Sequence, residues 1–182
     1  MIVVKKHKSA APPPQIGVSG CLLGQEIRYD GRHKSNTFIT TVLAQQFDLV
    51  PFCPEVAIGL GVPRPPIQLV TTDTGIRVRG VADASIDVTE QLTDYAHSIK
   101  PQLDPLSGYI FTARSPSCGL ENVRLVDAEN TNEKGTGIFA ATVKQLLPGL
   151  PLIEDEQLDQ TELREKFLAD VNKYHQQKFS DR

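Results

Sequence analysis

The chain has 182 residues, a formal net charge of −3, and a composition that is 40% hydrophobic and 23% charged. This length suits one compact domain whose core needs no disulfide to be stable. The slightly acidic balance argues against a dedicated nucleic-acid-binding protein, which normally carries an excess of Lys and Arg. No stretch is apolar for long enough to cross a bilayer. From the charge balance we expect no stable nucleic-acid partner, and from the lack of a long apolar stretch we expect no membrane partner.

Residues 1–14, MIVVKKHKSAAPPP, contain lysines and three consecutive prolines but no long apolar run. This composition is unlike a signal peptide and predicts a short, stiff leader. An odd number of cysteines in a chain without an export signal argues against a disulfide framework. We therefore expect a cytoplasmic protein with reduced thiols and a single domain over residues 15–182.

Apolar runs typical of buried strands alternate along the chain with segments that have helical spacing. A hairpin is indicated at Asp73-Thr74-Gly75, which separates two runs of alternating apolar residues. In chain order the expected elements are a strand at 15–20, a helix at 38–47, a strand at 48–54, a hairpin at 67–81, a helix at 87–103, a strand at 107–113, a helix at 135–150, a strand at 150–155 and a helix at 161–177. This alternation predicts a single-domain, Rossmann-like layered α/β fold with a mostly parallel central sheet plus a small hairpin. The charged stretch 154–169 is expected to be a solvated helix face or part of a subunit contact.

Cys21, Cys53 and Cys118 all follow the C-terminal end of a predicted strand. Ligands of open α/β sheets bind outside these strand ends, so the three thiols are expected to converge on one crevice. Free cysteine is often only a small buried hydrophobe, but each of these cysteines lies among Ser, Pro or Gly residues of a loop. Two chemical interpretations stay open: an iron–sulfur or metal site with an open coordination position, and a metal-free cysteine nucleophile with a histidine base.

Several motifs run in order from about Val18 to about Glu156 and read SGCLLG…RYDGRHK, CPEV, GVPRPP, RGVADASIDVT, ARSPSCG and GTGIFAA. This set of motifs resembles that of the thiouracil desulfidase family (TudS). The resemblance implies a 4Fe-4S cluster with three cysteine ligands and one open iron. The matching ligand positions are Cys21, Cys53 and Cys118. It also implies a stand-alone enzyme that removes the sulfur of a thiolated pyrimidine base or nucleotide by hydrolysis, without net redox change.

Further residues are expected to complete the site. Glu55, in CPEV, and Ser115, in RSPSCG, match positions that the resemblance connects with acid–base chemistry. Ser115 and Ser117 are each expected to orient water or to cap a turn, and Ser117 is also expected to be a substrate-binding residue. A helix entered through Gly135-Thr136-Gly137 offers backbone N–H groups to an anion, although plain helix initiation explains the same glycines. The basic residues expected at the mouth, where they would suit a substrate phosphate, are Arg28, Lys34, Arg64 and Arg114.

Two other functions compete with the desulfidase interpretation. A non-enzymatic iron–sulfur protein for electron transfer or sensing would normally use four protein ligands. A metal-free cysteine hydrolase needs a histidine beside one thiol. The sequence predicts no particular oligomeric state.

Overall fold

The computed structural model describes residues 12–126 and 133–180. The first eleven residues of the expected leader lie outside this range. The carbonyl of Pro14 accepts a hydrogen bond from the Asp48 N–H, so the chain is tied to the fold from the end of the triple proline. No helix in the described residues is long and apolar enough to cross a membrane.

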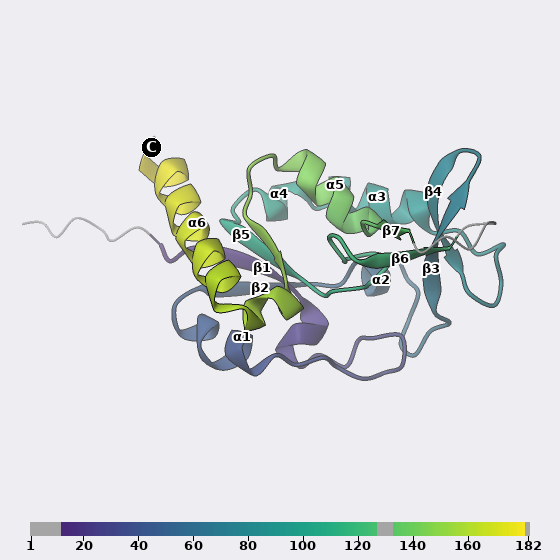
Figure 1. Ribbon diagram of the computed structural model, residues 1–182, viewed down its shortest axis with the longest axis horizontal. Helices are drawn as coiled ribbons and strands as arrows, with labels where there is room; N and C mark the ends of the chain where they lie inside the picture. The colour runs from purple at the N-terminus through teal and green to yellow at the C-terminus, as the bar shows by residue number, and fades with distance from the viewer. Residues whose placement is uncertain (1–11, 127–132, 181–182) are drawn as a thin grey trace, which may run out of the picture.

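The centre of the fold is a sheet of four parallel strands, which confirms the expected α/β fold class (Figure 1). Its strands, in spatial order, are β2 (Asp48–Phe52), β1 (Gln15–Ser19), β5 (Gly108–Phe111) and β8 (Leu152–Glu154). The chain passes from β1 to β2 on one side, and β5 then pairs with β1 on the other side. The strand order therefore reverses at β1 and β5, which makes their C-terminal ends the expected ligand-binding edge.

Helices cover both faces of this sheet (Figure 1). One face is covered by α3 (Thr89–Ser98), α4 (Lys100–Leu103) and α5 (Ile138–Leu146). The other face is covered by α1 (Thr37–Thr41) and the long α6 (Thr161–Ser180). At the C-terminal ends of β1 and β2 the chain turns into short helical segments, a 3-10 turn at Gly20–Leu23 and α2 (Pro54–Ala57), while a loop follows β5.

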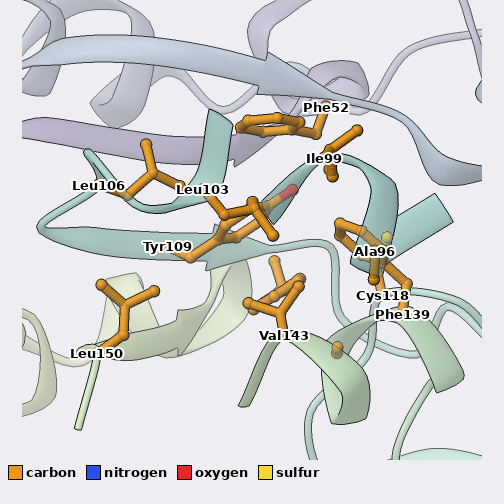
Figure 2. Packing of buried hydrophobic residues seen from close by; sticks show 12 residues of the cluster. Phe52, Ala96, Ile99, Leu103, Leu106, Tyr109, Cys118, Phe139, Val143 and Leu150 are labelled. Carbon is orange, nitrogen blue, oxygen red and sulfur yellow. The ribbon is translucent and has the colours of Figure 1, made fainter. Parts of the chain in front are cut away.

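The aromatic core on the α3–α5 face depends on a glycine in β1. Tyr109 stacks on Phe111 with ring centroids 4.0 Å apart. The Tyr109 ring also lies beside that of Phe52, with centroids 5.7 Å apart (Figure 2). A Cβ atom on Gly17 would lie 2.4 Å from Cδ2 of Tyr109, closer than carbon atoms can approach. Only glycine lets the Tyr109 ring lie across β1, which fixes the packing behind the strand ends.

A second four-stranded sheet contains the expected hairpin and two strands that were not expected. The hairpin is β3 (Ile67–Thr72) with β4 (Gly75–Gly80). β6 (Val123–Val126) pairs in parallel with β3, and the two-residue β7 (Lys134–Gly135) pairs with β6. The four-residue β6 lies between polar segments and is too short for its alternation to stand out in the sequence.

Several helix boundaries differ from those expected. The helix expected at 87–103 is divided into α3 and α4, because Pro101 cannot donate a backbone hydrogen bond and its ring clashes with the preceding turn. The helix expected at 38–47 ends at Thr41 and is followed by a 3-10 turn at Leu43–Gln45. A short helix, α2 (Pro54–Ala57), begins directly after Cys53 and was not expected.

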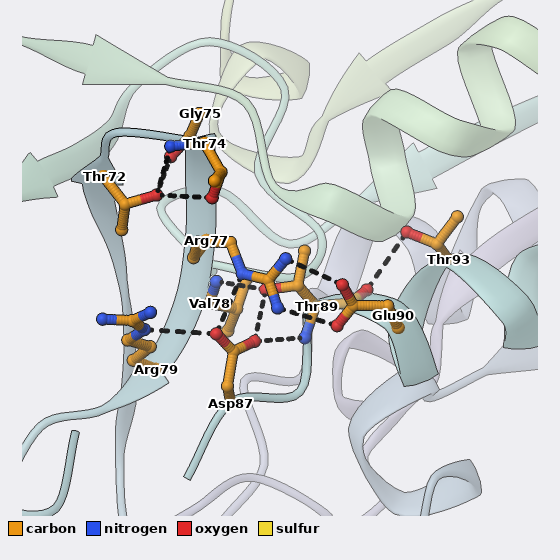
Figure 3. A network of polar contacts seen from close by, with 10 residues as sticks. All are labelled: Thr72, Thr74, Gly75, Arg77, Val78, Arg79, Asp87, Thr89, Glu90 and Thr93. Carbon is orange, nitrogen blue, oxygen red and sulfur yellow. Dashed lines mark hydrogen bonds and ion pairs between the residues drawn. The ribbon is translucent and has the colours of Figure 1, made fainter. Parts of the chain in front are cut away.

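A charged network joins the hairpin to the start of α3 (Figure 3). Asp87 Oδ2 accepts hydrogen bonds from the Nε atoms of Arg77 and Arg79 at 2.9 and 3.1 Å. Its Oδ1 accepts from the backbone N–H and the hydroxyl of Thr89 at 3.1 and 2.7 Å. Burial alone would raise the pKa of Asp87, but these hydrogen bonds hold it well below the usual range.

We expect Asp87→Asn to lower the free energy of unfolding by about 1.5–3 kcal/mol at pH 7, the range for hydrogen bonds to a charged group. A carboxyl with a depressed folded-state pKa stabilises the fold above its unfolded pKa, about 3.9 for Asp. That contribution is lost as the pH falls through the folded-state pKa. Urea unfolding of both proteins should therefore show a smaller difference at pH 3 than at pH 7, and an unchanged difference would contradict this account.

Candidate iron–sulfur site

The three cysteines lie around one cleft at the reversal point of the central sheet. Cys21 lies two residues after the end of β1, Cys53 directly follows β2, and Cys118 lies in the turn after β5. All three line a cleft of about 430 Å³, within the range of small-molecule sites. They are free thiols, Cys118 buried and the other two half-buried. The convergence expected from the strand ends is therefore present.

Each thiol has a hydrogen-bond partner that the sequence analysis did not identify. The Thr112 hydroxyl lies 3.1 Å from Sγ of Cys21. The Val56 N–H bonds to Cys53, and the Ser19 side chain bonds to Cys118. Ser19 and Thr112 end or follow neighbouring strands, so only the β1–β5 pairing places their hydroxyls beside the thiols.

Burial governs the protonation of these thiols. It raises the pKa of Cys21 and Cys53, and it raises the pKa of Cys118 well above the usual range. Thiols of this kind are poor nucleophiles because little thiolate forms at neutral pH. A bound metal would displace their protons, so the donor set suits a metal centre better than a free nucleophile.

The surroundings of the thiols fit a cluster. The hydroxyl of Tyr109 is buried and has no hydrogen-bond partner among the described residues. Its pKa is raised well above the usual range, first by burial and then by Cys118, Tyr95, Cys53 and Cys21. An unpaired buried donor near three thiols suits negatively charged sulfur. No three His, Cys, Asp or Glu side chains in the described ranges are grouped closely enough to hold one metal ion.

Glu55 lies beside the cysteines and is held from two sides. It is in the first turn of α2, two residues after Cys53, and its side chain is 12% exposed. The Ser117 hydroxyl donates to Oε1 at 2.8 Å. Arg64 donates to Oε2 from Nε and Nη2 at 2.9 and 2.8 Å. The carboxylate lines the cleft in a single fixed orientation.

These contacts correct two of the expected roles. Ser117 is fully buried and does not line the cleft, so it orients Glu55 and does not bind substrate. Arg64 lines the cleft but is 8% exposed, and it pairs with Glu55. It is therefore not a free cation at the mouth. The sequence placed Arg64 in a rigid loop, but it did not show the partner of the guanidinium.

Ser115 organises the turn that carries Cys118. Its Oγ accepts the N–H groups of Ser117 and Cys118 at 3.2 and 3.1 Å, and its carbonyl accepts the Gly119 N–H at 2.8 Å. A hydroxyl that accepts two hydrogen bonds keeps its proton to donate. Since Ser115 lines the cleft, it is placed to cap the turn and also to donate a proton or a hydrogen bond to a ligand.

The anion seat expected at Gly135-Thr136-Gly137 is not at the cleft. α5 begins at Ile138, and the N–H groups of Gly137, Ile138 and Ala140 donate to carbonyls of the turn that carries Cys118. A Cβ atom on Gly137 would lie 2.5 Å from the carbonyl carbon of Ser117. Glycine is needed here because the start of α5 packs directly on that turn. The N–H groups at the helix start therefore bind the carbonyls of the turn and not an anion.

The remaining basic residues at the mouth are Arg28, Lys34 and Arg114, which all line the cleft. Lys34 Nζ pairs with Asp155 and Glu156 at 2.9 and 3.3 Å, and Arg114 pairs with Glu156. Within the described ranges Arg28 forms no salt bridge. The mouth is therefore less basic than the four expected cations suggested. Among the described residues, Arg28 is the cation at the mouth that forms no salt bridge.

The charged stretch 154–169 is exposed over α6, at Glu162, Glu165 and Lys166, as expected of a solvated helix face, but its first two residues at the end of β8 are buried. Glu154 and Asp155 are 3% and 4% exposed. Oδ1 of Asp155 accepts the Ala113 N–H at 2.8 Å, and Oε1 of Glu154 accepts the Leu120 N–H at 2.6 Å. The two carboxylates brace both ends of the loop around Cys118. The only sequence signal for this role is their place directly at the end of a buried strand.

The sequence model of the 2-thiouracil desulfurase family matches residues 16–156. The chain belongs to this family. It is 28% identical over 148 residues to the uncharacterized protein YbbK of Bacillus subtilis (strain 168), covering 78% of this chain and 96% of YbbK. The fold matches the solved structure of a 4Fe-4S-dependent thiouracil desulfidase, TudS, with a TM-score of 0.63 and 29% identity. That match covers 84% of this chain and 98% of the TudS chain. The expected family is confirmed.

Proposed function

We propose that this chain is an iron–sulfur-dependent desulfidase for a small thiolated pyrimidine. Cys21, Cys53 and Cys118 hold a 4Fe-4S cluster that keeps one iron open. The observation that carries the proposal is the convergence of the three free thiols on one cleft beside a fixed carboxylate, Glu55. The family match and the likeness to a 4Fe-4S-dependent desulfidase support it.

The overall reaction is a hydrolysis in which electrons are neither gained nor lost. The ring thiocarbonyl and water give the ring carbonyl and hydrogen sulfide, so a carbon–sulfur bond breaks and a carbon–oxygen bond forms. When bound, the cluster supplies an iron that takes up soft sulfur and polarises the carbon–sulfur bond.

The chain's own residues handle water and protons. Glu55 accepts a proton from the water that attacks the ring carbon and passes it to the departing sulfur, which leaves as hydrogen sulfide. Its carboxylate is held for this task by Arg64 and Ser117. The Ser115 hydroxyl, whose acceptor positions are used by the turn, donates a hydrogen bond into the cleft.

The test is reconstitution under anaerobic conditions with iron and sulfide. We expect a brown protein with about four irons, the content of one cubane, that releases sulfide from thiouracil or thiouridine monophosphate with no added reductant or oxidant. A colourless protein that still releases sulfide would indicate a metal-free hydrolase. A cluster-containing protein that releases none would indicate an electron carrier or sensor.

Structural evidence weighs against the metal-free hydrolase. In the part of the chain that the structure describes, no histidine lines the cleft. His33 accepts a hydrogen bond from the Ser35 N–H, and His175 lies beside Ser107. A cysteine nucleophile that has a raised pKa and no histidine base in its cleft is unsuited to catalysis.

We expect Arg28 to favour a nucleotide over the free base. A charge-assisted hydrogen bond contributes roughly 1.5–3 kcal/mol, so Arg28→Gln should raise KM for thiouridine monophosphate by about ten- to a hundredfold. The kinetic constants for neutral thiouracil should change little. Steady-state kinetics on both substrates check this prediction. An equal decrease of kcat/KM for both substrates would show that Arg28 does not bind the phosphate.

A further inference from the structure

The contacts of Arg64 are typical neither of a surface arginine nor of an arginine that binds substrate. Its side chain is 4% exposed. Besides the two donations to Oε2 of Glu55, its Nη1 donates to the carbonyls of Ile27 and Gly61, each at 2.9 Å. Most of its N–H donors are thus used inside the protein, which leaves little capacity for a substrate anion.

The same residue is bonded to the loop that presents Arg28. The Arg64 N–H donates to the Tyr29 carbonyl at 2.9 Å, while its side chain binds the Ile27 carbonyl. These two carbonyls flank Arg28, which lines the cleft. Arg64 therefore bonds to the cleft-lining loop on one side and to the Glu55 carboxylate on the other.

We infer that Arg64 is a positioning residue that fixes the Glu55 carboxylate and links it to the Arg28 loop. The inference rests on the proposed role of Glu55. A planar guanidinium that donates twice to one oxygen holds the carboxylate's orientation, which a single ammonium group does not. Ser117 holds the other oxygen. Orientation matters because a small misplacement of a reacting group costs up to about a hundredfold in rate.

The inference and a direct role in substrate binding predict different kinetics. If Arg64 positions Glu55, Arg64→Gln in the reconstituted holoenzyme should lower kcat by about ten- to a hundredfold for both thiouracil and thiouridine monophosphate. KM should change by less than about threefold, because ground-state contacts to substrate are kept. A higher KM for the monophosphate alone, with kcat unchanged, would assign Arg64 to the phosphate and overturn the inference.

Two further variants separate positioning from general damage. Arg64→Lys keeps the charge but not the paired donors, so it should recover part of kcat. Arg77→Gln removes an arginine that pairs with Asp87 and Glu90 away from the cleft, and it should keep parental kcat and KM. Iron content and the absorption spectrum should match the parent in every variant. If Arg64→Gln does not fold, the kcat-against-KM comparison is made on Arg64→Lys.

A double variant provides the decisive experiment. If Arg64 acts only through Glu55, Glu55→Gln/Arg64→Gln should be no slower than Glu55→Gln alone, because the group that Arg64 positions is already disabled. Rates that fall by the product of the two single effects would show that Arg64 acts independently and would overturn the inference. A Glu55→Gln single variant with parental rate would instead contradict the proposed role of Glu55.

Discussion

Replacement of any one cysteine is expected to abolish both the cluster and the activity. Cys21→Ala, Cys53→Ala and Cys118→Ala each leave two thiols at a site that offers only three. No histidine or additional cysteine lines the cleft within the described residues to replace the lost ligand. Iron content and visible absorption after anaerobic reconstitution should fall to background, and sulfide release should fall with them.

Loss of the cluster must be separated from loss of the fold. We expect the central sheet and both of its covered faces to form in the Cys21→Ala and Cys53→Ala variants, because both side chains are half-buried at the strand ends. Cys118 packs in the aromatic core, so Cys118→Ser is a useful second variant of nearly the same size. Circular dichroism of each apo protein should match the parent. A folded variant that binds parental iron and stays active would refute three-cysteine ligation.

The edge of the fold that carries the site could be predicted from local patterns. Apolar runs indicated β1, β2 and β5. Because ligands bind beyond the C-terminal ends of parallel strands, these strands predicted that the three cysteines would meet at one cleft. This prediction needed no knowledge of side-chain contacts, because the cysteines follow their strands closely in the sequence. The structure confirms it through the strand order β2-β1-β5-β8.

The contacts that tune the site could not be predicted in the same way. Arg64 lies nine residues after Glu55 in a proline-containing loop, and whether such an arginine faces solvent or a carboxylate depends on the path of that loop. Gly137 illustrates a different limit, because a glycine before a helix fits both an anion seat and a close packing contact. The structure favours the packing contact, because a Cβ atom at this position would lie 2.5 Å from the carbonyl carbon of Ser117 and the N–H groups of the helix start already donate to that turn. Asp155 looked like part of a charged surface until its burial was known.

Glu55→Gln is expected to give a cluster-loaded protein that turns over very slowly. The change keeps the shape of the side chain, and the amide satisfies the same neighbours. Its oxygen accepts from Arg64 and its NH₂ group donates to the Ser117 hydroxyl, which can accept. What is lost is the ability to take a proton from water, a contribution of about 10²–10⁴-fold in rate. Iron content should be parental because the three thiols are untouched.

The measurement should follow a single turnover as well as the steady state. Loss of thiocarbonyl absorbance in the reconstituted Glu55→Gln protein should be slower by that factor, while substrate affinity stays near the parental value because no contact to the ring is removed. Glu55→Asp is the matched control, since it keeps a carboxylate but withdraws it by one methylene from Arg64 and Ser117. It should lie between the parent and Glu55→Gln. A Glu55→Gln rate within about threefold of the parental rate would show that Glu55 is not the proton acceptor, because loss of the acceptor should cost about 10²–10⁴-fold. Water would then have to lose its proton to another group at the cleft, and Ser115 would be the first residue to examine.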